Sequence, residues 1–170
     1  SAKPKLSVST PEAGVHLEPV EVVTPGGSYR FQAEIADDFE ERRVGLMNRP
    51  TLAEDRAMLF LFPGQEPSIQ GFWMKDTLIP LDIIYLAPDG RIVSIARNTT
   101  PLSEESLPSA GPASAVLEIN GGLSDRLGIA PGDRVRLFAS TRAEGEGGSI
   151  GRNGSVLTVL AADAKGMRVR

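Results

Sequence analysis

The sequence predicts a mainly β domain with one or two short helices. Three observations support this prediction: apolar and polar residues alternate at 29–35, an apolar run at 57–62 is too short for an independent helix, and a Pro-Asp-Gly turn at 88–90 separates two apolar runs. Alternation is typical of a strand with one wet face, and a short continuous apolar run is typical of a strand covered on both faces. Tight turns join antiparallel strands, so antiparallel sheets are expected.

The first two strands are expected to form a hairpin. Residues 20–24 are mostly apolar, and a Pro-Gly-Gly turn at 25–27 leads into the alternating run at 29–35. Gly and Pro are the residues that most often mark turns.

A helix of two to three turns is expected next, with arginines near its C-terminal end. Asp37 precedes Glu40 by three positions, which is a carboxylate version of the capping box. Acidic residues then give way to basic ones, as the helix dipole favours. Phe39, Leu46 and Met47 are predicted to share the packed face of this helix, and Pro50 ends the segment.

The later strands are predicted from apolar runs between turns. Residues 81–86 and 91–96 flank the Pro-Asp-Gly turn and predict a second hairpin. Residues 115–119 and 133–138 predict two further strands, with a single helical turn at 123–127 between them that a glycine ends.

The chain divides into a folded part and less regular ends. Residues 1–19 contain Pro and Ser and are interpreted as an N-terminal tether, followed by a β domain at 20–140. A Gly-rich linker is predicted at 141–154 and a C-terminal hairpin, packed on the domain or free of it, at 155–170. With 170 residues, 41% of them hydrophobic, the chain can build one substantial core.

Composition excludes several classes of function. The net charge is -4 and no long basic run occurs, so nucleic acid is not an expected partner. No stretch approaches the roughly 20 consecutive apolar residues that a membrane helix needs. The absence of Cys excludes disulfides, thiol nucleophiles, Cys-zinc sites and iron–sulfur clusters. A monomer without a cofactor is expected.

The stretch 71–82 holds the only Trp of the chain and its densest mixture of large apolar and charged side chains. In an extended chain Phe72 and Met74 would share one face, while Trp73 and Lys75 would share the other. A bend is expected directly afterwards, because Asp, Thr and Pro residues interrupt the run.

A candidate ligand-binding site follows if the short helix brings its arginines towards the charges of this stretch. Asp82 adjoins a buried strand and needs a partner, for which Lys75 and the arginines are candidates. Such a cluster could clamp an anionic or hydroxyl-rich ligand. In the structural alternative, the charges neutralise one another, fix the helix to the sheet and leave the Trp to packing. The candidate ligand-binding residues are Arg43, Arg49, Trp73, Lys75, Asp76, Thr77, Asp82 and Glu118.

Enzymatic chemistry has few residues available. His16 is the only His and lies in the predicted tether, which disfavours a Ser-His-Asp triad, a His-metal site and a His general base. No catalytic or metal-ligating residue is therefore assigned. A two-carboxylate hydrolase using Asp76, Asp82 or Glu118 is the enzymatic alternative, because glycoside cleavage needs two acids about 5 to 9 Å apart.

Several ordered motifs resemble the DUF192 family over about residues 29 to 138. They are Glu-Arg-Arg-Val-Gly-Leu-Met-Asn-Arg at 41–49, Met-Leu-Phe at 58–60, Phe-Trp-Met-Lys-Asp-Thr at 72–77, Ile-Pro-Leu-Asp at 79–82, Gly-Arg-Ile at 90–92, Val-Leu-Glu at 116–118, Gly128, and Gly-Asp at 132–133. The resemblance implies a compact, mostly β domain of sandwich- or barrel-like build, often found in exported bacterial and archaeal proteins. It implies no activity.

Two positions depart from the pattern of the family that the chain resembles. Ala57 stands where Gly is usual, and Asp76 stands where Asn is frequent. The second departure adds a negative charge to the centre of the candidate site.

These observations predict a periplasmic or secreted protein. The chain opens at Ser1 rather than Met, which suits a cleaved signal peptide or a tag scar, and the tether favours export. The predicted function is a non-enzymatic binding or interaction module of the cell envelope, with a small-molecule, glycan or protein ligand. The alternative is a carboxylate-dependent hydrolase acting on an envelope polymer or glycan.

Overall fold

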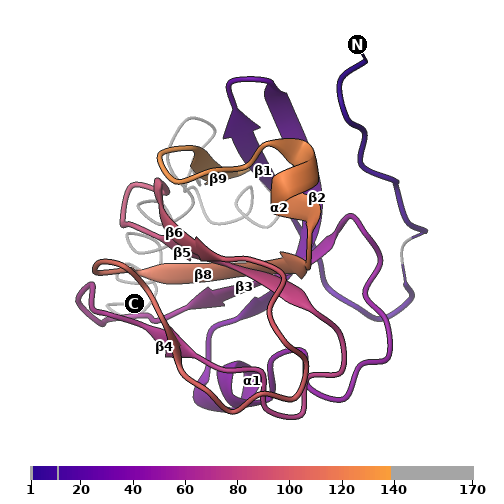
Figure 1. The fold of residues 1–170 in the computed structure, drawn as a ribbon. Coiled ribbons are helices and arrows are strands. Elements are labelled where there is room, and N and C mark those ends of the chain that lie inside the picture. The colour runs from indigo at the N-terminus through magenta and orange to yellow at the C-terminus, as the bar shows by residue number, and fades with distance from the viewer. Residues whose placement is uncertain (1, 11, 139–170) are drawn as a thin grey trace, which may run out of the picture.

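The computed structural model describes residues 2–10 and 12–138 (Figure 1). The predicted linker at 141–154 and the predicted C-terminal hairpin at 155–170 lie outside these residues. Within the described ranges, no helix has the length and apolar character needed to cross a membrane.

The described elements are mostly strands, with two short helices. In chain order they are β1 (Glu18–Thr24), β2 (Gly27–Ala36), α1 (Phe39–Val44), β3 (Arg56–Leu61), β4 (Gly71–Phe72), β5 (Leu81–Leu86), β6 (Ile92–Ala96), β7 (Leu107–Pro108), β8 (Ala115–Asn120), α2 (Leu123–Leu127) and β9 (Arg134–Leu137). The mainly β fold class, the hairpins predicted at 20–35 and 81–96, and the helical turn before β9 are confirmed.

Seven strands form one curled sheet in the order β6-β5-β8-β3-β2-β1-β9, and β4 pairs with β7 separately. The two edges of the large sheet approach each other, because the amide of Ile92 donates to the carbonyl of Asp133 (2.8 Å) and the amide of Val135 donates to that of Gly90 (2.9 Å). The sheet is therefore a half-barrel.

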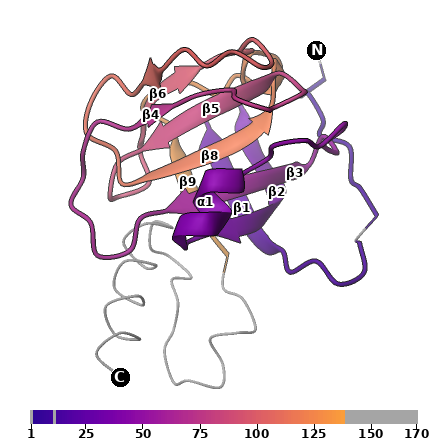
Figure 2. The ribbon, with the colours of Figure 1, turned by 90° about the horizontal axis from the view of Figure 1, so that it is seen from below.

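One strand pair differs from the antiparallel expectation. β2 and β3 are parallel, whereas the other neighbours in the large sheet are antiparallel. Parallel neighbours need a crossover of a dozen or more residues, and residues 37–55, which contain α1, supply it. This crossover carries α1 over one face of the sheet, beside β8 and β3 (Figure 2).

Apolar side chains cover the sheet on both faces. The α2 face includes Phe31 and Leu117 and is packed by Leu123 and Leu127 of α2. The opposite face, called the α1 face here, includes Met58, Phe60, Met74, Ile83 and Tyr85. Each residue of β3 and β5 is buried, as the apolar run at 57–62 and the largely apolar run at 81–86 predict.

Helix α1 begins one residue later than the sequence suggested. Asp38, not Asp37, is the N-cap: its Oδ1 accepts a hydrogen bond from the amide of Glu41 (2.7 Å), and Glu41 Oε1 accepts one from the amide of Asp38 (3.3 Å). The sequence holds two overlapping acid pairs three residues apart, so either register satisfied the capping rule.

The helix packs less tightly than predicted. None of its residues is buried, and Phe39, expected on the packed face, is 74% exposed. Gly45 ends α1 at a φ of 48°, and a Cβ there would stand 3.2 Å from the Phe60 ring. A glycine is therefore needed for the chain to turn this sharply so close to Phe60.

The described part of the predicted tether lies against the domain without regular structure before β1. The amide of Ser7 donates to Glu54 (2.9 Å), the amide of Ser9 donates to Asp55 (2.8 Å), and Glu12 accepts from the Arg56 guanidinium (3.2 Å).

Asp82 has a partner other than the one the sequence suggested. Neither Lys75 nor an arginine pairs with it; Oδ1 accepts from the amides of Asn98 (2.8 Å) and Gly122 (3.1 Å), and Oδ2 accepts from that of Ser124 (2.7 Å). The prediction of a cationic partner was wrong, because backbone donors at the start of α2 lie closer. This buried carboxylate fixes α2 to β5.

Replacing Asp82 with Ala should therefore destabilise the protein. Three backbone amides, that of Ser124 buried and the other two part-buried, lose a charged acceptor. This loss should lower the free energy of unfolding by about 3 kcal/mol in chemical denaturation. Asp125→Ala is the control, because its exposed pair with Arg97 should contribute under about 1 kcal/mol. Equal losses in the two variants would contradict this role.

Candidate functional site

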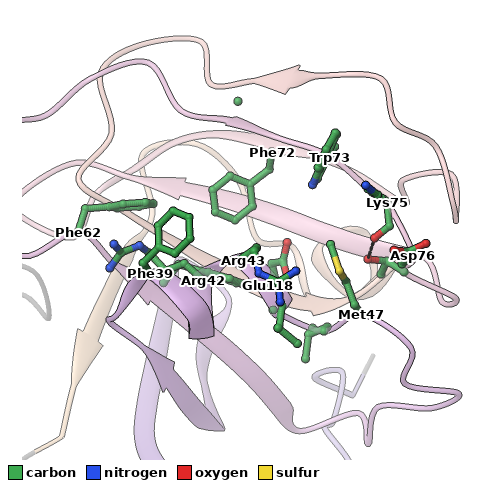
Figure 3. Close-up of a pocket in the computed structure, with 16 residues that line it drawn as sticks. Phe39, Arg42, Arg43, Met47, Phe62, Phe72, Trp73, Lys75, Asp76 and Glu118 are labelled. Atoms are coloured by element: carbon green, nitrogen blue, oxygen red, sulfur yellow. Dashed lines mark hydrogen bonds between the residues drawn. The ribbon is translucent and has the colours of Figure 1, made fainter.

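A cavity of about 490 Å³ lies between α1 and residues 71–77, on the α1 face of the sheet (Figure 3). Its lining comes from α1 and the turn that follows it, from the end of β3, from β4 and the segment after it, and from one side chain of β8. The cavity brings together segments that are distant in sequence, as ligand sites commonly do.

Aromatic rings form much of the wall. Phe60 and Phe72 pack edge to face with ring centroids 5.0 Å apart, and Phe72 packs in the same way against Tyr85 at 6.0 Å. Phe62 and Phe39 line the opposite end from Trp73, which is 46% exposed. A planar or aliphatic ligand body would find apolar surface on several sides.

Glu118 of β8 is the acidic group of the floor. Its cross-strand neighbours are Met58 on β3 and Ile83 on β5, so apolar side chains flank it on both sides. It is 4% exposed, and its carboxyl group forms no hydrogen bond or ion pair within the described part of the chain. Burial raises its pKa to about 8. At neutral pH Glu118 is therefore mostly a neutral acid, able both to donate and to accept a hydrogen bond.

Cations predominate around the cavity. Arg42 donates through Nη1 to the carbonyl of Leu61 (3.0 Å), with its guanidinium 5.3 Å from the Phe62 ring centroid. Arg43 pairs with Glu40 outside the cavity at 2.5 Å. Lys75 Nζ lies 5.3 Å from the Trp73 ring centroid and, of the residues that the structure describes, none forms an ion pair with it.

A tight turn holds the residues after Trp73. Asp76 has a φ of 52°, its carbonyl accepts from the amide of Asn48 (2.8 Å), and Thr77 Oγ1 donates to the carbonyl of Lys75 (3.0 Å). Met74 is fully buried and anchors the turn to the sheet. Asp and Asn tolerate this left-handed conformation better than most residues, so the backbone of the turn by itself explains why an Asp stands at position 76.

The structure brings most of the predicted site residues together. The cavity is lined by Arg43, Trp73, Lys75, Asp76, Thr77 and Glu118. Arg49 and Asp82 are not among its lining residues, and Asp82 belongs to the opposite face of the sheet. Sequence reasoning missed Arg42 and the phenylalanines, although the alternation of Phe60 and Phe62 along one face of a strand was a usable signal.

Arg49 belongs to a separate ion-pair network. It makes two hydrogen bonds to Glu34 at 2.5 and 3.0 Å, and Glu34 also accepts from Arg56, which is buried and reaches Glu12 as well. Burial opposes ionisation of Glu34, but the bonds and charges of Arg49 and Arg56 together lower its pKa. This network fits the structural interpretation of the charges.

The geometry limits the chemistry of the cavity. Over residues 2–10 and 12–138, no three His, Asp or Glu side chains gather as a metal site. Two carboxyl groups, Glu118 and Asp76, line the same cavity, and within the described ranges neither forms an ion pair.

Residues 21–137 match the model of the DUF192 family, which is described as an uncharacterized ACR, and the chain belongs to this family. The resemblance seen in the sequence is thus confirmed. The family description names no activity.

Two solved structures share the fold. A protein of unknown function from Novosphingobium aromaticivorans DSM 12444 is 44% identical, with a TM-score of 0.69, over 78% of this chain and 93% of that one. A protein described as a suggested transcription regulator, from Sinorhizobium meliloti 1021, is 39% identical, with a TM-score of 0.68, over 75% of this chain and 98% of that one. Among curated proteins, none matches the chain.

The buried acid should make stability depend on pH in a particular direction. Folded Glu118 holds its proton more tightly than the unfolded chain, so its contribution to the free energy of unfolding falls as pH rises from 4.5 to about 8. Glu118→Gln should therefore match the wild type near pH 5 and exceed it by about 4 kcal/mol near pH 9. Urea denaturation across this range measures the difference. A gap that is constant with pH would contradict the burial of an unpaired acid.

Proposed function

We propose that this chain is a non-enzymatic binding module whose ligand enters the cavity between α1 and residues 71–77. The observation that carries the proposal is the floor of the cavity, where Glu118 is buried without a partner among apolar neighbours. An apolar residue there would stabilise the fold more, because an ionisable side chain placed among apolar neighbours loses hydration that no protein partner replaces. Departures of this kind from a purely stabilising sequence concentrate at functional sites.

The dimensions of the cavity support a small ligand. Its volume of about 490 Å³ lies within the range of small-molecule sites, roughly 300 to 1,000 Å³. Phe39 and Val44 of α1 remain exposed beside it, so a ligand could bury apolar surface that the fold itself leaves uncovered.

The proposed location is the cell envelope, for which the family resemblance and the tether-like composition before β1 are the support. Expression from the complete coding sequence in a bacterial host, followed by separation of periplasm, medium and cytoplasm, checks this location. Recovery of the protein from the periplasm or medium is expected, and its retention in the cytoplasm would contradict the proposed location.

A carboxylate-dependent hydrolase is the second candidate. A neutral acid and an unpaired carboxylate in one cavity, Glu118 and Asp76, are the pair that glycoside cleavage uses. Asp82 takes no part in this version, because its carboxylate is held by the start of α2. Binding is preferred, because Asp76 already has a local role in its turn.

A small-molecule screen followed by NMR tests the binding proposal. Trp73 is the only Trp, so its indole N–H gives one signal inside the cavity. Ligands from a library of neutral, anionic and cationic ring compounds should shift this signal together with the amides of residues 42–47 and 71–77. Val44→Tyr, at the cavity, should weaken these ligands severalfold, whereas Ile69→Tyr, exposed elsewhere, should not. Absence of any such ligand would overturn the proposal.

Incubation with envelope glycans separates binding from hydrolysis. Glycans recovered after long incubation and examined by mass spectrometry should be intact. Release of cleaved sugar by the wild type, lost in both Glu118→Gln and Asp76→Asn, would favour the hydrolase instead.

A further inference from the structure

We propose that the ligand of this cavity is a small amphipathic anion, with its acid group beside Lys75, its ring or chain between the aromatic walls, and a hydroxyl or carbonyl group at Glu118. This inference rests on the proposed binding function and specifies the chemical class of the ligand. It follows from the different chemistry of the floor, the wall and the mouth.

Glu118 at the floor of the cavity favours a neutral hydrogen-bonding group on the ligand. Glu118 is more than nine-tenths buried, and Met58 and Ile83 occupy the positions beside it on the sheet, so hydrogen-bonding partners can reach its carboxyl group only from the cavity. An acid group on the ligand would lie against this acid, and one of the two would have to remain protonated. A hydroxyl or carbonyl satisfies Glu118 without adding charge to a buried site.

The charged residues that line the cavity favour a negatively charged group on the ligand. Arg42, Arg43 and Lys75 line the cavity against one exposed carboxylate, that of Asp76. Arg43 is already neutralised by Glu40 and one Arg42 nitrogen is already bonded, whereas Lys75 has no ion pair in the part of the chain that the structure describes. The Lys75 ammonium is therefore the cation most available to pair with a ligand anion, with Asp76 limiting the gain.

The aromatic walls favour an anionic ligand over a cationic one. Rings surrounding one buried carboxyl group could form a cage for an ammonium ion. In this cavity, however, Lys75 lies over Trp73 and Arg42 lies over Phe62, so the protein's own cations already use these two rings. A ligand cation at Glu118 would share the cavity with Arg42 and Lys75, neither of which forms an ion pair within the described residues, so the balance favours an anion.

A matched set of probes tests the three contacts. We would titrate the intact protein near pH 7 with 4-hydroxyphenylacetate, phenylacetate, 4-ethylphenol and tyramine, following the Trp73 indole signal by NMR. The expected order has 4-hydroxyphenylacetate tightest, because it alone offers both the anion and the hydroxyl. Removal of either group should weaken binding about tenfold, and tyramine should be weakest.

Variants assign each contact to a residue. Lys75→Gln should remove the preference for 4-hydroxyphenylacetate over 4-ethylphenol and leave 4-ethylphenol itself unchanged. Glu118→Leu should remove the preference for 4-hydroxyphenylacetate over phenylacetate, while Glu118→Gln, which still donates and accepts, should keep it. This rescue separates hydrogen bonding from a general effect of the substitution on folding.

The outcomes distinguish this inference from the broader proposal. Tightest binding of tyramine, or preferences that survive in Lys75→Gln and Glu118→Leu, would overturn the anion assignment and leave a binding module with another ligand class. If neither these probes nor any compound of the library shifts the Trp73 signal, both the anion assignment and the proposed binding function are contradicted.

Discussion

Both faces of the large sheet are covered by packed residues, and the other features depend on this constraint. The covering residues bury the ionisable side chains of the central strands. Asp82 on β5 and Glu118 on β8 meet this constraint differently. Asp82 turns to the α2 face, where three backbone amides of the β6 and α2 connections hold it. Glu118 turns to the α1 face, where its cross-strand neighbours are Met58 and Ile83 and no donor reaches it. One acid therefore fixes the fold, and the other faces a cavity.

The cavity exists because the crossover between β2 and β3 spans the α1 face without filling it. A parallel pair requires such a crossover, and its helix here is six residues long with none of them buried. Gly45 turns the chain back against Phe60, and the fully buried Met74 holds the opposite wall. These rigid anchors on each side maintain an open space that a longer, packed helix would occupy.

Local patterns predicted most of the strands, whereas the chemistry of the site depended on contacts that no local pattern contains. Alternation and turn residues are local, so the two hairpins could be read from the chain; the parallel pairing of β2 with β3 depends on a crossover and could not. Arg43 and Arg49 looked equivalent, but α1 ends at Gly45, and Arg49 turns to Glu34 instead of the cavity. The state of Glu118 depends on its cross-strand neighbours, which only the register of three strands defines.

The cavity floor holds an acid that has no ion pair among the described residues and is mostly neutral at pH 7. The most direct test of this state is a ¹³C NMR titration of the glutamate side-chain carboxyl groups in the intact protein, with Glu118→Gln used to assign the signal. The Glu118 carbon should titrate with a midpoint near 8. A midpoint near the ordinary glutamate value of 4.5 would mean that bulk water or a charged partner stabilises the carboxylate, and would contradict an unpaired neutral acid in the cavity.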